Sequence, residues 1–145
     1  MNDNDRALCA ATAHLLQASG AVAVWGLALT MIALAVLALT ARSLSLLSCM
    51  GFGAVAVIGL LERYLTLRVR FDARLFDHLG RGTVGSLAAL DSALQRLGLR
   101  PSAHGAPRQL DDRVLGARQL MQRHTLAVAC QSAMFLLALL TQDLR

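Results

Sequence analysis

The residues best placed for chemistry in this sequence are arginines that follow a long apolar run. At 100° per residue in a helix, Arg63, Arg70, Arg74 and Arg81 fall within about 20° of one another and form a stripe. Asp77 is spaced to pair with Arg74 and Arg81, whereas Arg63 and Arg70 have no acidic partner at helical spacing on their own face. Guanidinium groups in such a stripe suit anionic lipid headgroups, which attract each basic residue by about 1 kcal/mol. We expect contact with lipid, and the alternative is docking of an acidic cytosolic protein.

A second charged feature lies on the opposite, apolar face of the same predicted helix. Arg68 and Asp72 interrupt this face and are four positions apart, so their side chains are neighbours. The spacing predicts an ion pair at the edge of a helix contact. Such a pair is better attested as a device for fixing register than as a source of stability.

Two further polar residues stand in or beside apolar runs. Gln131 is the one strongly polar side chain within a run, and we expect it to make an interhelical hydrogen bond worth about 1 kcal/mol. Glu62 is the only glutamate and follows an apolar run directly. Because Arg63 is adjacent, we expect Glu62 to be solvated at the boundary of the membrane.

The remaining reactive residue types are scattered. The cysteines lack the spacing of a metal or redox motif, the histidines occur singly, and there is no glycine-rich phosphate loop or hydrolase motif. The sequence therefore predicts no catalytic residue, no metal site and no cofactor. The cysteines are Cys9, Cys49 and Cys130.

Composition sets the class of protein that must position these residues. The 145 residues are 56% hydrophobic and 16% charged, against about a quarter charged in soluble domains, and the mean hydropathy is +0.54. All fourteen basic residues are arginine, which is typical of GC-rich coding DNA and carries no functional weight. The sequence pI near 10.4 fits basic cytoplasmic segments of a membrane protein, and we expect no nucleic-acid partner.

Hydropathy predicts an all-α integral membrane protein with three transmembrane helices. A span needs about 20 mostly apolar residues, with about 17 as the minimum. The expected organisation is an amphipathic N-terminal segment at 1–20, transmembrane helices at 21–41, 44–61 and 125–141, an arginine-rich helical region at 62–124, and a tail at 142–145.

Arginine counts predict the orientation. Eleven of the fourteen arginines lie within 62–124, and basic loops stay on the cytoplasmic side. The N-terminus is then also cytoplasmic and the C-terminus lies outside. Within this region we expect the second span to continue as a helix to Leu79, a short helix ending at Gly98, a linker at 98–108 that holds both prolines, and a last helix that continues into the third span.

These features favour a small accessory or scaffold protein of the bacterial inner membrane, without enzymatic activity. Three thin helices bury little surface on their own, so we expect a homo-oligomer or a membrane-protein partner. A small pore, a holin-like or a transporter-associated protein is the second hypothesis. A lipid-modifying membrane enzyme is the third.

Overall fold

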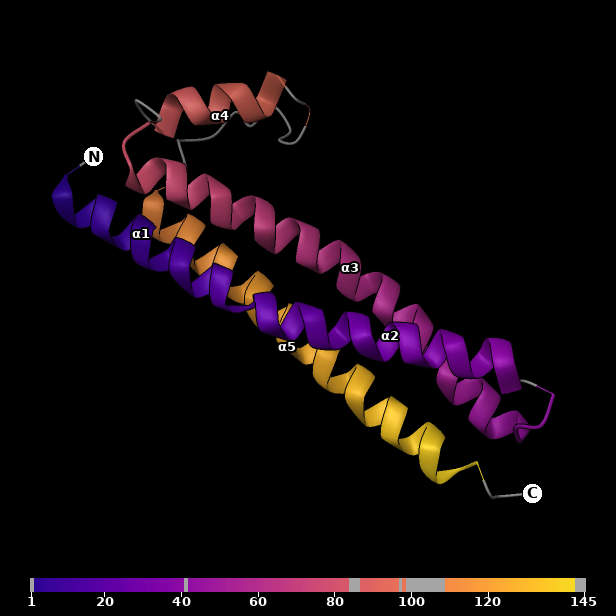
Figure 1. Cartoon of the computed structure of the whole chain (residues 1–145). Coiled ribbons are helices and arrows are strands. Elements are labelled where there is room, and N and C mark those ends of the chain that lie inside the picture. The colour runs from indigo at the N-terminus through magenta and orange to yellow at the C-terminus, as the bar shows by residue number, and fades with distance from the viewer. Residues whose placement is uncertain (1, 41, 84–86, 97, 99–108, 143–145) are drawn as a thin grey trace. The chain divides into compact units, whose positions relative to one another are not determined.

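A computed structural model gives the fold of residues 2–40, 42–83, 87–96, 98 and 109–142. These described residues form helices and short turns, without a strand (Figure 1). The all-helical prediction is therefore confirmed for this part of the chain. Three stretches of helix are also long and apolar enough to cross a membrane. Residues 99–108 of the predicted linker and 143–145 of the predicted tail lie outside the described residues. The helices are α1 (Asp3–Ala18), α2 (Gly20–Thr40), α3 (Leu46–Gly80), α4 (Leu87–Arg96) and α5 (Leu110–Leu140).

Local side chains explain where the first two helices begin. Asn2 and Asp5 exchange hydrogen bonds, Asp5 N to Asn2 Oδ1 at 2.8 Å and Asn2 N to Asp5 Oδ2 at 3.1 Å. This reciprocal cap satisfies two backbone donors that the first turn of α1 leaves free. Ser19 separates α1 from α2, and its carbonyl accepts from Ala23 N at 3.1 Å to start the second helix.

The third and fifth helices are long and unbroken. Helix α3 has 35 residues and α5 has 31, so they are about 52 Å and 46 Å long. The predicted helix continuity is confirmed, because α3 runs without a break to Gly80 and α5 joins the region before residue 124 to the apolar run after it. That these runs cross a membrane stays a prediction. Gly82 has a φ of 70°, a left-handed conformation that glycine adopts without a steric penalty. Thr83 N bonds the His78 carbonyl there and ends α3.

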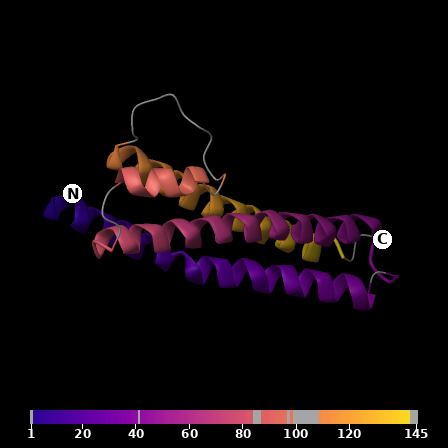
Figure 2. The same ribbon diagram turned by 90° about the horizontal axis from the view of Figure 1, so that it is seen from above.

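The chain divides into two compact units, and each is described by itself. We call Met1–Gln17 with Arg70–Gln119 the arginine-rich unit, and Ala18–Val69 with Leu120–Arg145 the apolar unit. In the apolar unit, α2, the first part of α3 and the second part of α5 lie side by side in both views (Figures 1 and 2).

Hydrogen bonds define how the helices of the apolar unit are paired. Ser48 Oγ donates to the Ala138 carbonyl at 2.7 Å, and Ser45 Oγ donates to the Thr141 carbonyl at 2.9 Å. The residue numbers rise on one helix as they fall on the other, so α3 and α5 are antiparallel. The indole of Trp25 on α2 bonds Ser132 Oγ of α5 at 3.1 Å.

Buried positions in the apolar unit alternate at spacings of three and four residues. This spacing is the signature of helices that pack at shallow left-handed angles with interlocking side chains. Small residues occupy several of these positions, so the backbones approach closely; a Cβ placed on Gly59 would lie 2.1 Å from Thr30 Oγ1. On α3 the series is Ser48, Phe52, Val55, Gly59, Glu62, Thr66 and Val69, and on α5 it includes His124, Val128, Gln131 and Ala138.

The arginine-rich unit has its own buried residues, contributed by α1, α3 and α5. Helix α1 comes close to α3 at Gly80, where an added Cβ would lie 3.2 Å from the backbone nitrogen of Ala10. Arg113 of α5 forms an ion pair with Asp91 of α4, and both side chains are largely buried. Among the residues of this unit whose burial the structure describes, the buried apolar ones are Cys9, Ala13, Leu16, Ala73, Phe76, Leu79 and Ala117.

Candidate functional site: a buried polar cluster in the apolar unit

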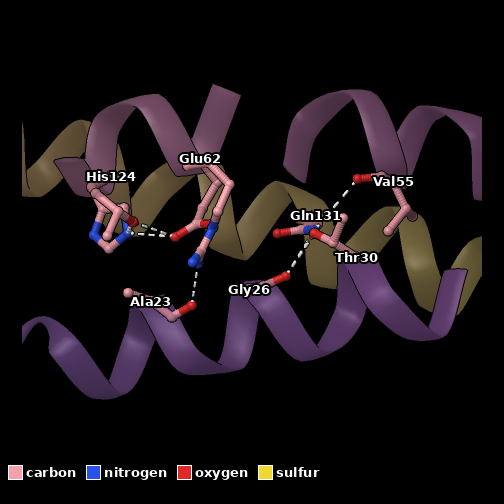
Figure 3. Close-up of polar contacts among 9 residues, drawn as sticks. Ala23, Gly26, Thr30, Val55, Glu62, His124 and Gln131 are labelled. Carbon is pink, nitrogen blue, oxygen red and sulfur yellow. Dashed lines mark hydrogen bonds and ion pairs between the residues drawn. The ribbon is translucent and has the colours of Figure 1, made fainter. Parts of the chain in front are cut away.

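A fully buried carboxylate is the centre of the candidate site. Glu62, on the inner face of α3, has no exposed surface. Its Oε1 accepts a hydrogen bond from Thr66 Oγ1 at 2.7 Å and lies 2.9 Å from Nε2 of His124, which is also fully buried. Figure 3 shows the imidazole facing the carboxylate across the space between α5 and α3. This finding corrects the expectation that Glu62 would be solvated.

The other carboxylate oxygen is held by the adjacent arginine. Arg63 donates from Nε and from Nη2 to Glu62 Oε2, each at 2.7 Å. The Arg63 side chain is one third exposed, and Nη2 also donates to the Ala23 carbonyl of α2. The guanidinium therefore neutralises the buried carboxylate and joins α3 to α2, while part of it stays at the surface of the apolar unit.

A second polar group lies seven residues further along α5. Gln131 is fully buried, and its Nε2 lies 2.8 Å from Thr30 Oγ1, 3.1 Å from the Gly26 carbonyl and 3.4 Å from the Val55 carbonyl. These partners belong to α2 and α3, so one amide group contacts both of the other helices (Figure 3). The predicted role of Gln131 was an interhelical contact of this kind.

Gly26 brings the two polar groups close together. A Cβ placed on Gly26 would lie 3.0 Å from Glu62 Cδ and 3.2 Å from Gln131 Oε1. The carboxylate and the amide oxygen therefore face the same point on α2. A side chain at this position would push both of them aside.

Two buried polar atoms of the cluster have no hydrogen-bond partner within the described part of the chain. They are Nδ1 of His124 and Oε1 of Gln131. Because Glu62 Oε1 is an acceptor, the His124 Nε2 that faces it carries the proton, and Nδ1 then holds a lone pair. Buried polar atoms without partners are rare in proteins and mark places where a further group can bind or react.

Beyond Gln131 the interior of the apolar unit is mostly apolar, and Ser48 is a buried polar residue there. Ala33, Phe52, Val55 and Ala138 are all buried and form one cluster. The rings of Phe52 and Phe135 meet edge to face, with centroids 5.7 Å apart. The polar cluster is thus enclosed on this side by packed hydrocarbon.

The predicted arginine stripe divides between the two units. Arg63 is in the apolar unit and is engaged as described, so its partner is the neighbouring Glu62 rather than a residue at helical spacing. Arg70, Arg74 and Arg81 are exposed residues of the arginine-rich unit. Arg81 forms an ion pair with Asp77 at 3.0 Å. This is one of the two pairings that the spacing of Asp77 predicted, the other being with Arg74. Contact of the stripe with lipid or protein stays a prediction.

Arg68 and Asp72 were predicted to form an ion pair on the packed face of the helix. Arg68 is exposed, and its Nη1 lies 3.4 Å from the hydroxyl of Tyr64. Asp72 is half-buried. Their ion pair stays a prediction, and exposure of Arg68 places it outside the packed face on which the periodicity put it.

Sequence reasoning missed Glu62 and His124 as members of one site. The signal that could have found them is the alternation of three and four residues along α3 and α5, which places both on the packed faces. Glu62 follows Val55 by seven positions, and Gln131 follows His124 by seven.

Fold and site together define an α-helical protein with three helices able to cross a membrane and an ionisable cluster enclosed between them. Comparison of the chain with protein-family models, with curated proteins and with solved structures found no match.

Proposed function

We propose that this chain is a small accessory or scaffold protein of the bacterial inner membrane, which associates with itself or with a membrane-protein partner. The single observation that supports this most is the reversed distribution of polarity in the apolar unit. Glu62, His124 and Gln131 are fully buried, whereas large apolar side chains such as Val57 and Leu126 are about two thirds exposed. A bilayer solvates such a surface, and water does not.

The length of the apolar unit fits this location. Sixteen residues separate Glu62 from Leu46 on α3, and sixteen separate His124 from Leu140 on α5, which is about 24 Å on each helix. A hydrocarbon core is about 30 Å thick. The polar cluster would then lie within the apolar layer near one of its boundaries, where the exposed part of Arg63 can reach the headgroups.

The interior of the unit favours a scaffold over an open pore. A conducting path needs polar groups or water along its length. The four buried residues of the apolar cluster instead close the space beyond Gln131. The hydrogen bonds of Gln131 and Ser48 fix the positions of the helices relative to one another, which is what a structural subunit requires.

In this proposal the arginine-rich unit lies in the cytoplasm, with the N-terminus inside and the C-terminus outside. Reporter fusions at the two ends test the orientation. The exposed Arg70 and Arg74 contact anionic headgroups or an acidic protein. Changing both to glutamate is expected to reduce binding to vesicles that contain anionic lipid, with Arg118→Glu as the matched control because Arg118 is also exposed in this unit. Equal binding by both variants would contradict the proposed role of the stripe.

The test of the scaffold proposal is the state of the purified full chain. Gentle detergent extraction from the native host, followed by mass spectrometry, should show a homo-oligomer or a bound membrane protein. Photobleaching of single labelled complexes in liposomes at decreasing protein-to-lipid ratios should give more than one step per complex. A monomer in both measurements would refute the proposal.

A further inference from the structure

The outer face of α3 carries an exposed arginine whose side chain turns back toward the apolar run. Arg68 and Tyr64 are both exposed, and Nη1 of Arg68 lies 3.4 Å from the Tyr64 hydroxyl. Tyr64 is one helical turn closer than Arg68 to the apolar run that ends at Leu61. Side chains on a helix lean toward its N-terminus, and the contact with Tyr64 follows this direction. A positive charge and a hydroxyl group therefore lie together at one end of an apolar surface.

We propose that Arg68 and Tyr64 bind the phosphate group of an anionic phospholipid, whose acyl chain lies along the outer face of α3. The inference rests on the membrane location proposed above. The site is separate from Arg70 and Arg74, which belong to the arginine-rich unit. All residues of the proposed site belong to the apolar unit.

The two donors lie at the level that a lipid headgroup occupies. Tyr64 follows Glu62 by two residues and Arg68 follows it by six, which is about 3 Å and about 9 Å along the helix. Glu62 is near a boundary of the hydrocarbon in the proposed location, and the interfacial layer beyond this boundary is about 5–8 Å thick. Because the guanidinium of Arg68 reaches back to the Tyr64 hydroxyl, it stays within this layer. Tyrosine is enriched at the same depth in membrane proteins.

The chemistry of the two side chains fits a phosphate group. A guanidinium has five N–H donors in a planar fork that matches two phosphate oxygens, and the contact with Tyr64 uses one of them. The Tyr64 oxygen accepts this hydrogen, so its own O–H can donate to the phosphate. The charge of this surface is positive, because Arg68 is exposed whereas Glu62 is fully buried on the inner face. Asp72 follows Arg68 by one turn, on the side away from Tyr64.

An apolar path continues from the two donors on the same face of α3. At 100° per residue, Gly53, Val57, Leu60, Tyr64 and Arg68 fall within about 80° of one another. Val57 is 67% exposed and Leu60 is 71% exposed, and a Cβ added to Gly53 would meet nothing within 4 Å.

The length of this path matches one leaflet of the bilayer. Leu60, Val57 and Gly53 lie about 6, 11 and 17 Å from Tyr64 along the helix axis, and half of the hydrocarbon core is about 15 Å thick. One acyl chain can therefore follow α3 from the headgroup to the middle of the bilayer. Free phosphate would use the two donors but not this path, so the geometry favours a lipid.

Native mass spectrometry of the full chain in detergent micelles measures the affinity for one added lipid. The probes are phosphatidylglycerol, phosphatidylcholine and glycerol phosphate. Phosphatidylglycerol should bind at least about fivefold more tightly than phosphatidylcholine, and Arg68→Gln should lower its affinity about fivefold. Tyr64→Phe, which removes one hydrogen bond, should lower it at least about twofold.

Arg123→Gln is the matched control. Arg123 is exposed and precedes His124, which contacts Glu62, so it lies at the same level of the apolar unit on another helix. This variant should change the affinity by less than about twofold, because Arg123 is outside the proposed site. Equal losses in Arg68→Gln and Arg123→Gln would overturn the proposal, because the lipid would then be held by general charge. Glycerol phosphate that binds as tightly as the lipid would also overturn it.

A second measurement keeps the unaltered chain. Tyr64 is the only tyrosine, so tyrosine with ¹³C at the carbon that bears the hydroxyl places one label in the site. In solid-state NMR of liposomes, the lipid ³¹P should dephase this carbon more strongly when phosphatidylglycerol is added to phosphatidylcholine. Equal dephasing in both membranes would refute the site even if a variant does not fold.

The outcomes separate this inference from the proposed function. If the chain is recovered from cells without detergent, the membrane location itself is wrong. If the chain is embedded in the membrane and Arg68→Gln binds phosphatidylglycerol as tightly as the unaltered chain, only the lipid site is wrong.

Discussion

The close approach of α2 and α3 at Gly59 makes a sharp prediction for the substitution Gly59→Ala. The added Cβ would lie 2.1 Å from Thr30 Oγ1, 2.9 Å from Thr30 Cγ2 and 3.0 Å from Thr30 Cβ. Rotation of the threonine cannot relieve the contact, because another atom of the same side chain replaces Oγ1. Rotation would also break the bonds of Oγ1 to the Gly26 carbonyl and to Gln131, both 2.8 Å. The two helices must therefore move apart by about 0.9 Å to restore a 3.0 Å contact.

The expected cost follows from this geometry. Overpacking a tight helix contact costs about 1–3 kcal/mol, and each interhelical hydrogen bond that weakens adds about 0.6 kcal/mol in a membrane protein. Replacing glycine by alanine within a helix returns about 0.5–1 kcal/mol through backbone entropy. We expect Gly59→Ala to lower the free energy of unfolding by about 1–3 kcal/mol.

Helix α3 also provides the matched control. Gly53 lies six residues earlier in the same helix, and a Cβ there would meet nothing within 4 Å. Gly53→Ala should therefore leave the free energy of unfolding unchanged or raise it by up to about 1 kcal/mol. Both variants gain the same helix propensity, so the difference between them measures the contact with Thr30.

Unfolding of the full chain by titration of mixed micelles with a denaturing detergent gives these free energies. The double variant Thr30→Ala with Gly59→Ala completes a thermodynamic cycle, in which the cost of Gly59→Ala should shrink by about 1 kcal/mol or more. If Gly59→Ala is as stable as Gly53→Ala, or if the cycle shows no coupling to Thr30, the packing of α2 against α3 described above is wrong.

Three further predictions concern other contacts. Gln131→Leu should lower the free energy of unfolding by about 1–2 kcal/mol, because it removes hydrogen bonds to both neighbouring helices. The same detergent titration measures this loss, and an unchanged unfolding midpoint would contradict the prediction. Gly80→Ala should leave the arginine-rich unit less stable than Gly116→Ala by about 1 kcal/mol, because the new Cβ would lie 3.2 Å from the backbone nitrogen of Ala10, whereas the space at Gly116 is open. Hydrogen exchange of that unit measures the difference between the two variants. Burial raises the pKa of the Cys9 thiol, and the Asp5 carboxylate raises it further. Less thiolate therefore forms at neutral pH, so alkylation of Cys9 should be slow and should accelerate with rising pH. Asp5→Asn should speed the alkylation, and a rate equal to that of a free thiol would contradict the burial.

The periodicity and hydropathy of the sequence were enough to predict the helices. Uncharged runs indicated three possible spans, and the absence of glycine or proline between Glu62 and Leu79 predicted that the second would continue unbroken. Gly82 ended α3 where the glycine pair indicated, because its left-handed conformation suits a helix end. These features depend on residues that are neighbours in the sequence, so they can be recognised without the tertiary structure.

The state of Glu62 could not be predicted in the same way. Beside Arg63 and at the end of an apolar run, it has the local sequence of a solvated boundary residue. Its burial depends on His124, which is 62 residues away and brings α5 over the carboxylate. The spacing of buried positions places both residues on packed faces, but it does not say which faces meet. That information lies in the antiparallel register of α3 and α5, which Ser48 and the carbonyl of Ala138 show directly.

The distance along the chain between Glu62 and His124 also has a consequence for biosynthesis. Ribosomes add about 5–20 residues per second, so Glu62 is added to the chain about 3–12 s before His124. During this interval the carboxylate has only Thr66 and Arg63 as partners, and the hairpin of α2 and α3 has one open side. In the membrane location proposed above, a newly made hairpin should therefore stay at the insertion machinery, or near the aqueous boundary, until α5 arrives. Truncation before His124 would leave this nascent intermediate as a substrate for quality-control proteases.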